Sequence, residues 1–416
     1  MKGRDKMKLL TFKGGIHPDD GKQLAKDKKI VSILPKEELV YPLSQHIGAP
    51  AKPVVKAGDR VLKGQKIAEA GGFVSASIFA SVSGEVKGIE KRFNPSGAKV
   101  DSIVVENDFQ YEEVSYLPVK PLEEMTKEEI IDRIKEAGIV GMGGAGFPTH
   151  VKLSPKEPEK IDYVIANCAE CEPYITADYR RMLENPEELI SGMRVVLSIF
   201  PQAKGIFGVE DNKPDCIEKL RKLTEKESRM EVKALKTKYP QGAERQLIFA
   251  TTGRAINSSM LPADAGCVVD NVETMIAIHT AVVEGKAVTE RIVTLSGDAV
   301  KEPGNFKVLF GTNHQEVIEA GGGFKNPPEK IISGGPMMGF AMFTTDTPIT
   351  KTSSSILGFT KDEVKANEPT ACINCGRCVE VCPSRIIPSR LADLAERHDE
   401  EGFKKLEGLE CIECGS

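Results

Sequence analysis

The feature that most constrains this 416-residue chain is a run of cysteines near its end. The stretch ACINCGRCVEVCPSR has CxxCxxCxxxC spacing and contains Cys372, Cys375, Cys378 and Cys382, with Pro383 directly behind the fourth cysteine. On a tight loop, thiols at this spacing face a common centre, and the cysteine before the proline serves a neighbouring centre. The spacing therefore indicates a module that binds iron–sulfur clusters.

Two other uses of these cysteines agree less well with the pattern. A zinc ribbon needs only two CxxC pairs, and three successive thiols followed by Cys-Pro fit it poorly. A disulfide framework is typical of small secreted chains, whereas this chain is long and its start, MKGRDKMKLL, lacks the apolar core of an export signal. We therefore interpret the tail as a bacterial ferredoxin-type module.

A second run of cysteines begins just before the given sequence stops. Cys411 and Cys414 lie in GLECIECGS and open another CxxCxxC pattern. Two 4Fe-4S clusters need four thiolates each, about eight in all, while this tail supplies six. We expect residues 362–416 to form a two-cluster domain that is truncated at its C-terminal end and holds its clusters poorly. The predicted metal ligands are Cys372, Cys375, Cys378, Cys382, Cys411 and Cys414.

Composition excludes several classes of function. Hydrophobic residues make up 40% of the chain, charged residues 28%, and the net charge is -5. These values are typical of a globular protein of several domains without a basic face for DNA or RNA. The sequence has no apolar run that approaches the ~20 residues needed to cross a bilayer. We expect a cytoplasmic protein that meets a membrane only through partner subunits.

The stretch from Lys29 to Val105 predicts a small barrel of short strands within a first domain of residues 1–110. VVKAGDRVLKGQKIAEA alternates apolar and polar residues around two turns, and ASVSGEVKGIE predicts a hairpin at Ser83-Gly84. The arrangement resembles the lipoyl-like barrel-sandwich family, whose members carry a modified lysine on a hairpin tip. The corresponding stretch AGGFVSASIFAS has no lysine, so we favour a docking or packing module over a carrier.

Strands and helices alternate over residues 120–288. TKEEIIDRIKEAG predicts a helix that Thr126 and Glu129 begin as a capping box and that Gly138 ends. IDYVIANC, GIFGVE and MEVKALK predict strands, and NPEELISGMRVVLSIF and KPDCIEKLRKLTEK predict the helices between them. This alternation predicts a mostly parallel α/β sheet.

A glycine-rich loop is the first segment of this domain with chemical character. GMGGAGFPTHVK, residues 141–152, matches GxGxxG. Glycine lets backbone N–H groups approach a phosphate closely, so such a loop can bind the phosphate of a nucleotide or a flavin. A plain glycine-rich turn is the alternative, because the strand that would complete a dinucleotide fingerprint is brief.

The second segment is NCAECEPYITADYR, which follows the strand IDYVIANC at the end where open α/β sheets bind ligands. Cys168 and Cys171 form a CxxC without a second pair nearby. A zinc site is therefore a poor interpretation, and a redox pair and two packed thiols are left open. Glu170 and Glu172 are candidate acceptors for a sugar or a nicotinamide.

Four motifs together resemble the flavin-bearing, NADH-oxidising subunit of respiratory complex I. GMGGAGFPTHVK, NCAECEP, YPQGAERQL and DNVETM occur in that family's order. The resemblance implies FMN as a bound cofactor, with Glu170 and Glu172 near the nicotinamide nucleotide. The residues that it implies around FMN are Gly141, Gly143, Gly144, Gly146, Lys152, Asn167, Gly242, Glu244, Asn271 and Thr274. The chain departs from these motifs at Ala169, Ala243 and Asp270, where the family has Asp, Glu and Asn.

Residues 289–345 resemble the β-grasp, SLBB-like module that follows the flavin domain in the same family. IVTLSGDAVKEPGNFKVLFGT alternates like strands with turns at Gly297-Asp298 and Pro303-Gly304, and GTNHQEVIEAGGGF predicts a helix from Thr312. The expected fold is thus a multidomain α/β chain with a barrel-sandwich domain, a flavoprotein-like domain, a β-grasp domain and a helical ferredoxin-like tail.

This order of modules resembles the RnfC family of the Rnf electron-transport complex. The resemblance implies an NADH-dependent flavin and iron–sulfur oxidoreductase that passes electrons between NADH and ferredoxin. Its partners would be membrane subunits that translocate ions, with this chain peripheral on the cytoplasmic face of the cell membrane. We expect no catalytic acid–base residue, because hydride transfer to a flavin needs orientation more than proton transfer. A cobalamin-reductase-like protein and a cluster-bearing scaffold without flavin are the alternatives.

Overall fold

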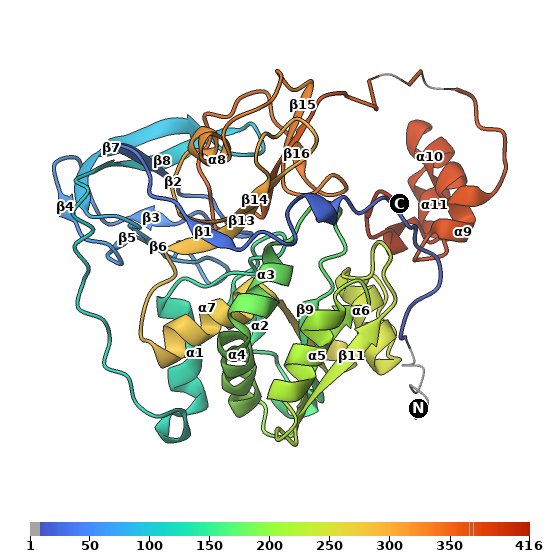
Figure 1. Cartoon of the computed structure of the whole chain (residues 1–416). Helices are drawn as coiled ribbons and strands as arrows, with labels where there is room; N and C mark the ends of the chain where they lie inside the picture. The colour runs from blue at the N-terminus through green and yellow to red at the C-terminus, as the bar shows by residue number, and fades with distance from the viewer. Residues whose placement is uncertain (1–8, 366, 369) are drawn as a thin grey trace, which may run out of the picture.

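The computed structural model describes residues 9–365, 367–368 and 370–416. Most of the start MKGRDKMKLL, on which we based the absence of an export signal, lies outside the described residues. So do the first eight residues of the predicted domain 1–110 and two positions of the predicted tail domain, 366 and 369. Figure 1 shows the β-rich modules above the α/β domain and the tail helices at its right side.

The α/β domain is built on a four-stranded, wholly parallel sheet, as predicted. Its strand order is β11-β10-β9-β12. The strands are β9 (Tyr163–Cys168), β10 (Lys204–Glu210), β11 (Met230–Leu235) and β12 (Cys267–Asn271). The first three match the predicted strands, whereas β12 was not predicted.

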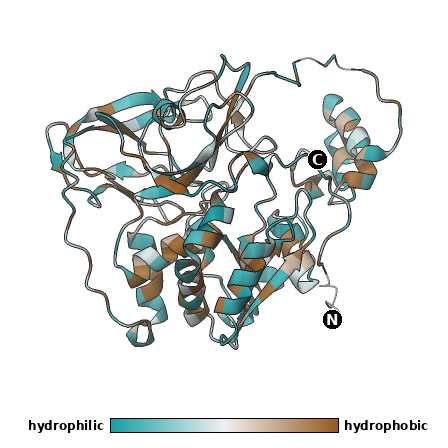
Figure 2. Cartoon of the chain, viewed as in Figure 1, coloured by the Kyte–Doolittle hydropathy of each residue, from teal (hydrophilic) through white to brown (hydrophobic). Residues whose placement is uncertain are grey.

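Helices cover both faces of this sheet. They are α1 (Lys127–Glu136), α2 (Thr149–Lys152), α3 (Ala177–Glu184), α4 (Pro186–Ile199), α5 (Pro214–Leu223), α6 (Glu244–Thr252) and α7 (Val272–Val283). Val164 and Ala166 of β9 belong to the core that contains α4 and α7, while Ile165 packs with α6. Because both faces are buried, β9 is a nearly continuous apolar run. Figure 2 shows apolar residues along these helices and strands.

The predicted capping box of α1 is confirmed. Thr126 accepts a hydrogen bond from Glu129 N, and the Glu129 side chain accepts one from Thr126 N. Gly138 follows the helix with a φ of 66°, which is the left-handed conformation that glycine adopts at little cost. Short 3-10 turns connect elements of the chain at η1 (Lys22–Leu24), η2 (Leu122–Glu124), η3 (Pro158–Lys160), η4 (Pro262–Ala265) and η5 (Gly408–Glu410).

The N-terminal barrel consists of two small sheets. One has the order β2-β8-β7-β4 and the other the order β3-β5-β6. The strands are β2 (Glu38–Pro42), β3 (Lys52–Pro53), β4 (Arg60–Val61), β5 (Lys66–Glu69), β6 (Ile78–Phe79), β7 (Gly84–Phe93) and β8 (Lys99–Asn107). The predicted hairpin at Ser83-Gly84 is wrong, because β6 and β7 lie in different sheets. The observed hairpin joins β7 to β8 through a turn in which Gly97 N donates to Asn94 O.

The β-grasp module has a six-stranded sheet of order β1-β14-β13-β17-β15-β16. Its elements are β1 (Ile30–Ser32), β13 (Glu290–Ser296), β14 (Gly304–Leu309), α8 (His314–Ala320), β15 (Lys330–Ser333), β16 (Phe340–Ala341) and β17 (Ser355–Phe359). The N-cap of α8 is Asn313, one residue after the predicted start. β1 and β17 lie outside the predicted range 289–345, so this sheet takes one strand from the predicted N-terminal domain and one from the segment that follows the range.

The tail forms three short helices, α9 (Arg377–Val381), α10 (Pro388–Glu396) and α11 (Glu400–Lys405). Its apolar core is small and consists of Cys382, Ile386, Leu391 and part of Phe403. We call residues 10–24 the N-terminal arm; it runs between the tail and the α/β domain. Its Gly15 N donates to Val381 O over 2.7 Å. Within the described part of the chain, no helix is both long enough and apolar enough to span a membrane.

Candidate functional site

Three of the four predicted motifs meet where β9 and β12 end. Asn167, near the end of β9, donates from Nδ2 to Gly242 O over 2.8 Å. Gly242 N in turn donates to Cys171 Sγ over 3.3 Å. The parallel neighbour of Asn167 on β12 is Asn271. The carboxyl edge of the sheet, where open α/β folds bind ligands, thus gathers these motifs.

Residues 141–147 of the predicted segment 141–152 form a loop, which is called the glycine-rich loop below. This loop lies against the first turn of α7. Asn271 caps this helix by accepting a hydrogen bond from Thr274 N (2.9 Å), and Thr274 Oγ1 accepts one from Met142 N (2.9 Å). A Cβ on Gly143 would lie 2.7 Å from Asn271 Cγ, so this position requires glycine. Around Gly144, by contrast, no described atom lies within 4 Å of the Cβ position. The backbone there is open to a ligand.

Lys152 lies at the end of α2 and reaches β12. Its Nζ donates to Val269 O (2.6 Å) and to Asp270 Oδ1 (3.2 Å), and it lies 4.0 Å from Glu244 Oε1. Burial opposes the charged form of Lys152, but the carboxylates of Asp270 and Glu244 outweigh it and raise its pKa. Lys152 is therefore a cation held at β12, next to the residue that precedes Asn271.

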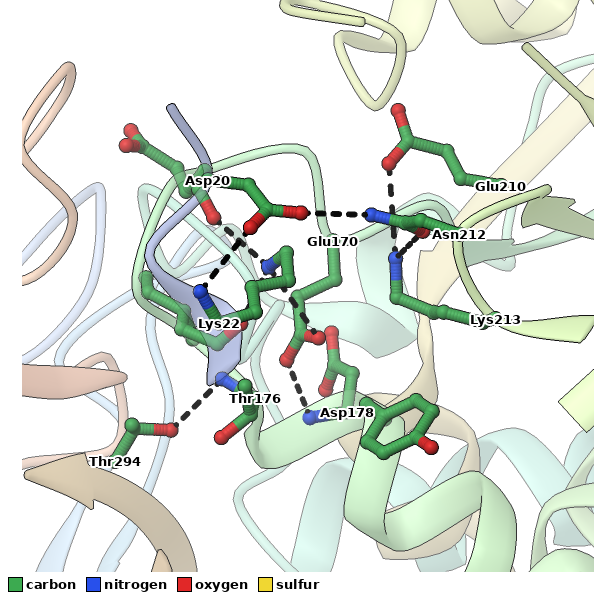
Figure 3. A network of polar contacts seen from close by, with 12 residues as sticks. Asp20, Lys22, Glu170, Thr176, Asp178, Glu210, Asn212, Lys213 and Thr294 are labelled. Atoms are coloured by element: carbon green, nitrogen blue, oxygen red, sulfur yellow. Dashed lines mark hydrogen bonds and ion pairs between the residues drawn. The ribbon is translucent and has the colours of Figure 1, made fainter. Parts of the chain in front are cut away.

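The loop after β9, residues 169–176, is called the carboxylate loop below. Glu170 accepts a hydrogen bond from Asp178 N (2.7 Å), and Glu172 accepts one from Met337 N of the β-grasp module (3.1 Å). Burial raises the pKa of both glutamates. Figure 3 shows Glu170 within a polar network that includes Lys22 and Asp178. The two glutamates thus contact different neighbours, although they share one loop.

Several buried polar atoms at this edge have no hydrogen-bond partner among the described residues. They are Glu170 Oε2, Glu172 Oε1, Asp270 Oδ2 and both side-chain amide atoms of Gln241. Buried polar groups are normally paired, so a cluster of unpaired ones needs an explanation. A polar ligand such as FMN or a nicotinamide nucleotide supplies such partners, and the residues present fit these groups. Gln241 was not predicted, although it lies inside the motif YPQGAERQL.

Cys168 and Cys171 behave as packed thiols. Both are free, and Cys168 is fully buried. Burial raises the pKa of Cys171 to about 12 and that of Cys168 well above its ordinary value. A reactive cysteine needs an accessible thiolate. Of the alternatives left open by the sequence, the structure favours two packed thiols over a redox pair.

The barrel packs on the glycine-rich loop. Phe73, on the tip that lacks a lysine, lies edge-on to His150 with ring centroids 6.5 Å apart. A Cβ on Gly146 would lie 2.9 Å from Thr352 Cγ2 and 3.2 Å from Gln45 O of the barrel. Deeper in the same junction, Lys351 Nζ donates to Ser77 O of the barrel over 2.6 Å. These contacts agree with a packing role for the barrel.

The six tail cysteines are free but are not gathered. Cys372, Cys375 and Cys411 are exposed, Cys378 and Cys414 are half-buried, and Cys382 is buried. Among the residues that the structure describes, no group of three or more His, Cys, Asp or Glu side chains converges on a metal position. The donor atoms are those that an iron–sulfur cluster uses. The residues therefore fit the cofactor in kind, and cluster binding would have to draw the sulfurs together.

The tail nevertheless lies beside the candidate flavin site. Tyr239 Oη donates to Cys414 O over 2.6 Å. Glu410 accepts hydrogen bonds from Ser258 N (2.9 Å) and from Arg245 Nη1 (3.1 Å). Tyr239 and Arg245 both belong to the motif YPQGAERQL, so the cysteine-bearing tail contacts the same segment that borders the site.

Four protein-family models match the chain, in the predicted order. They are the RnfC barrel sandwich hybrid domain over residues 10–110, the Nuo51 FMN-binding domain over 134–280, the SLBB domain over 292–341 and the 4Fe-4S dicluster domain over 365–416. The predicted fold class is confirmed, as are FMN-binding and 4Fe-4S domains. The predicted domain boundaries and the individual site residues stay predictions.

The chain is also similar to curated proteins over most of its length. It is 48% identical to a subunit of the proton-translocating ferredoxin:NAD(+) oxidoreductase complex of Clostridium ljungdahlii, over 94% of this chain and 85% of that protein. It is 46% identical to the counterpart from the Na(+)-translocating complex of Acetobacterium woodii, over 93% and 88%. The identity with the counterpart from the ion-translocating oxidoreductase complex of Rhodobacter capsulatus is 37%, over 96% and 78%.

Among solved structures, the chain resembles one from an NAD+-reducing NiFe-hydrogenase in the H2-reduced state. The TM-score is 0.52 at 19% identity, covering 71% of this chain and 59% of that chain. This likeness concerns the fold alone. The family models and the high identity to whole curated proteins agree with the predicted membership, and this chain belongs to the RnfC family, whose members are parts of ion-translocating ferredoxin:NAD(+) oxidoreductase complexes.

Proposed function

We propose that this chain is the electron-input subunit of a membrane-bound Rnf-type complex. It passes electrons between NADH and ferredoxin through FMN and 4Fe-4S clusters, and partner subunits couple this transfer to ion translocation. The relatives from Clostridium ljungdahlii and Acetobacterium woodii are subunits of ferredoxin:NAD(+) oxidoreductase complexes, which supports this proposal. The chain then lies on the cytoplasmic face of the membrane and is held there by its partners.

The observation that carries the proposal is the set of buried polar atoms at the carboxyl edge of the sheet that have no hydrogen-bond partner among the described residues. Gly143 and Gly144 let the backbone approach a phosphate, and the cation of Lys152 favours an anion beside them. Asn167 and Thr274 hold the loops that surround the site.

Bound FMN supplies the chemistry of accepting a hydride and releasing single electrons. The part of the protein is to bind FMN and the nicotinamide nucleotide and to orient them toward each other. Glu170 and Glu172 each offer one carboxylate oxygen that accepts no hydrogen bond from the described residues to the hydroxyl or amide donors of a nicotinamide nucleotide. Cys372, Cys375, Cys378, Cys382, Cys411 and Cys414 are the proposed cluster ligands. The docking of the tail on YPQGAERQL keeps these ligands close to the flavin site.

The test is the flavin and iron content of the anaerobically purified chain, followed by addition of NADH. We expect bound FMN, iron and acid-labile sulfide at less than full occupancy, and loss of the flavin absorption when NADH is added. Iron without flavin and without a response to NADH would instead support a cluster-bearing scaffold. A colourless protein with stoichiometric zinc would contradict both.

A further inference from the structure

Two residues of the carboxylate loop have a backbone conformation that residues with a Cβ rarely adopt. Glu170 has a φ of 48° and Tyr174 a φ of 66°. These values lie in the left-handed region, where a residue with a Cβ is disfavoured. Such a conformation persists only where surrounding groups fix it. The shape of the loop that carries both candidate nucleotide acceptors therefore depends on contacts from outside.

Two buried lysines bind the backbone of this loop. Lys22 donates from Nζ to Glu172 O (3.0 Å) and to Ile175 O (2.5 Å). Lys213 donates from Nζ to Ala169 O (2.6 Å). In Figure 3, Glu170 lies between the two lysines. Charge-assisted hydrogen bonds of this kind are stronger than neutral ones, so the two cations fix both ends of the loop.

Lys22 belongs to the N-terminal arm, which lies outside the α/β domain in the sequence. Gly21 has a φ of 54°, and a Cβ there would lie 2.3 Å from the Tyr174 ring. Asp20 O accepts a hydrogen bond from Tyr174 N (2.6 Å), and its carboxylate accepts one from Lys22 N (3.2 Å). These contacts hold the N-terminal arm close to the carboxylate loop and place Lys22 against it.

Lys22 also sets the charge around Glu170. Its side chain is 7% exposed, and Nζ lies 3.7 Å from Glu170 Oε2. Burial raises the pKa of Glu170 and lowers the pKa of Lys22, and the opposite charge of each partner opposes the shift of the other. Lys213 also opposes the rise at Glu170. Loss of Lys22 would therefore release the backbone of the loop and favour the protonated form of Glu170, which accepts hydrogen bonds less well.

We propose, on the basis of the proposed function, that Lys22 is a positioning residue for the nicotinamide nucleotide. It fixes the carboxylate loop so that Glu170 and Glu172 present their unpaired oxygens, and it does not itself touch the ligand. The N-terminal arm is then a working part of the nucleotide site, and the α/β domain alone is incomplete.

The test compares Lys22→Met with Lys28→Met in the full chain loaded with FMN. Lys28 lies shortly after the N-terminal arm and is exposed. We expect Lys22→Met to raise the KM for NADH about tenfold, the effect of losing a charge-assisted hydrogen bond. With ferricyanide as acceptor, kcat and FMN content should stay within about twofold. Hydrogen exchange should be faster in residues 169–176 of Lys22→Met and unchanged in Lys28→Met.

Gly21→Ala is a second variant, which displaces the arm without removing a charge and should raise KM in the same direction. Thermal unfolding will show whether Lys22→Met folds. If it does not fold, Gly21→Ala replaces it in the test. Unchanged exchange of the carboxylate loop, or an unchanged KM, in the folded variant contradicts the role of Lys22. A wild-type chain that binds FMN but does not react with NADH contradicts the proposed function instead, and the exchange data still decide whether Lys22 fixes the loop.

Discussion

Lys152 donates from Nζ to Oδ1 of Asp270 over 3.2 Å, and Asp270 directly precedes Asn271, against which Gly143 of the glycine-rich loop packs. In the flavin subunits that the motif DNVETM resembles, the position of Asp270 holds asparagine. An anionic ligand next to Lys152 would have to compete with this aspartate for the charge of Lys152. The departure of the chain from the family pattern therefore has a physical consequence at the site.

Asp270→Asn should strengthen FMN binding. The variant removes a buried negative charge next to Lys152, and we expect the Kd for FMN to fall roughly tenfold, about 1.4 kcal/mol. Fluorescence quenching of FMN during titration measures this Kd. Asp132→Asn, on the exposed face of α1, is the matched control and should leave the Kd unchanged. Equal or weaker binding by Asp270→Asn would mean that Lys152 does not meet the phosphate.

Gly143→Ala and Gly144→Ala should separate packing from ligand approach. At Gly143, the new Cβ would press on Asn271, the N-cap of α7, so stability should fall by about 1–2 kcal/mol. At Gly144, where no described atom lies within 4 Å of the Cβ position, stability should change by less than about 0.5 kcal/mol. FMN binding should nevertheless weaken in both. Thermal unfolding and FMN titration measure the two effects, and full FMN affinity in Gly144→Ala would place the phosphate elsewhere.

The chain shows why only part of this organisation could be predicted from the sequence. The capping box of α1 and the three strands β9 to β11 were predicted because their signals are local, in side chains a few residues apart. Four short motifs indicated the candidate site for the same reason. β12 was missed because its run is brief and leads directly into α7.

The remaining features depend on contacts between distant segments. β1 pairs with β14 in the β-grasp sheet, although the two strands are far apart in the sequence and β1 lies within the predicted barrel. The hairpin predicted at Ser83-Gly84 failed because turn residues cannot say whether the flanking strands share a sheet. The contact of Lys22 with the carboxylate loop has no local signal either, since a lysine in a polar stretch is usually solvated.

Lys351 should make stability depend on pH. Burial lowers its pKa to about 7, while the unfolded chain has the ordinary value of about 10.4. Between these values the unfolded chain binds more protons than the folded one, so the free energy of unfolding should rise with pH. In Lys351→Met this contribution is absent. Between about pH 7 and about pH 10, the free energy of unfolding of the wild type should therefore rise by up to a few kcal/mol relative to that of the variant.

Denaturant unfolding at several pH values measures this difference. Lys222→Met, at an exposed position of α5, should follow the wild-type curve and is the control. Parallel curves for the wild type and Lys351→Met would show that burial does not lower the pKa of Lys351 in the folded chain.

Glu410→Ala should loosen the tail from the α/β domain. The variant removes the acceptor for Ser258 N and for Arg245 Nη1, and we expect the local stability of the docked tail to fall by about 1–2 kcal/mol. Hydrogen exchange of α11 and η5 measures this. Glu396→Ala, on the exposed side of α10, should have no effect. If the hydrogen-exchange rates of α11 and η5 are the same in Glu410→Ala and Glu396→Ala, the contacts of Glu410 do not hold the tail on the α/β domain.

The central claim is that the four motifs form one FMN site at the carboxyl edge of the β9–β12 sheet. Equilibrium titration of the full chain with FMN, with Gly143→Ala in parallel, tests it most directly. The account predicts saturable binding of one FMN per wild-type chain and strongly weakened binding in the variant. A folded wild-type chain that binds no FMN, or a variant that binds it equally well, would contradict the account.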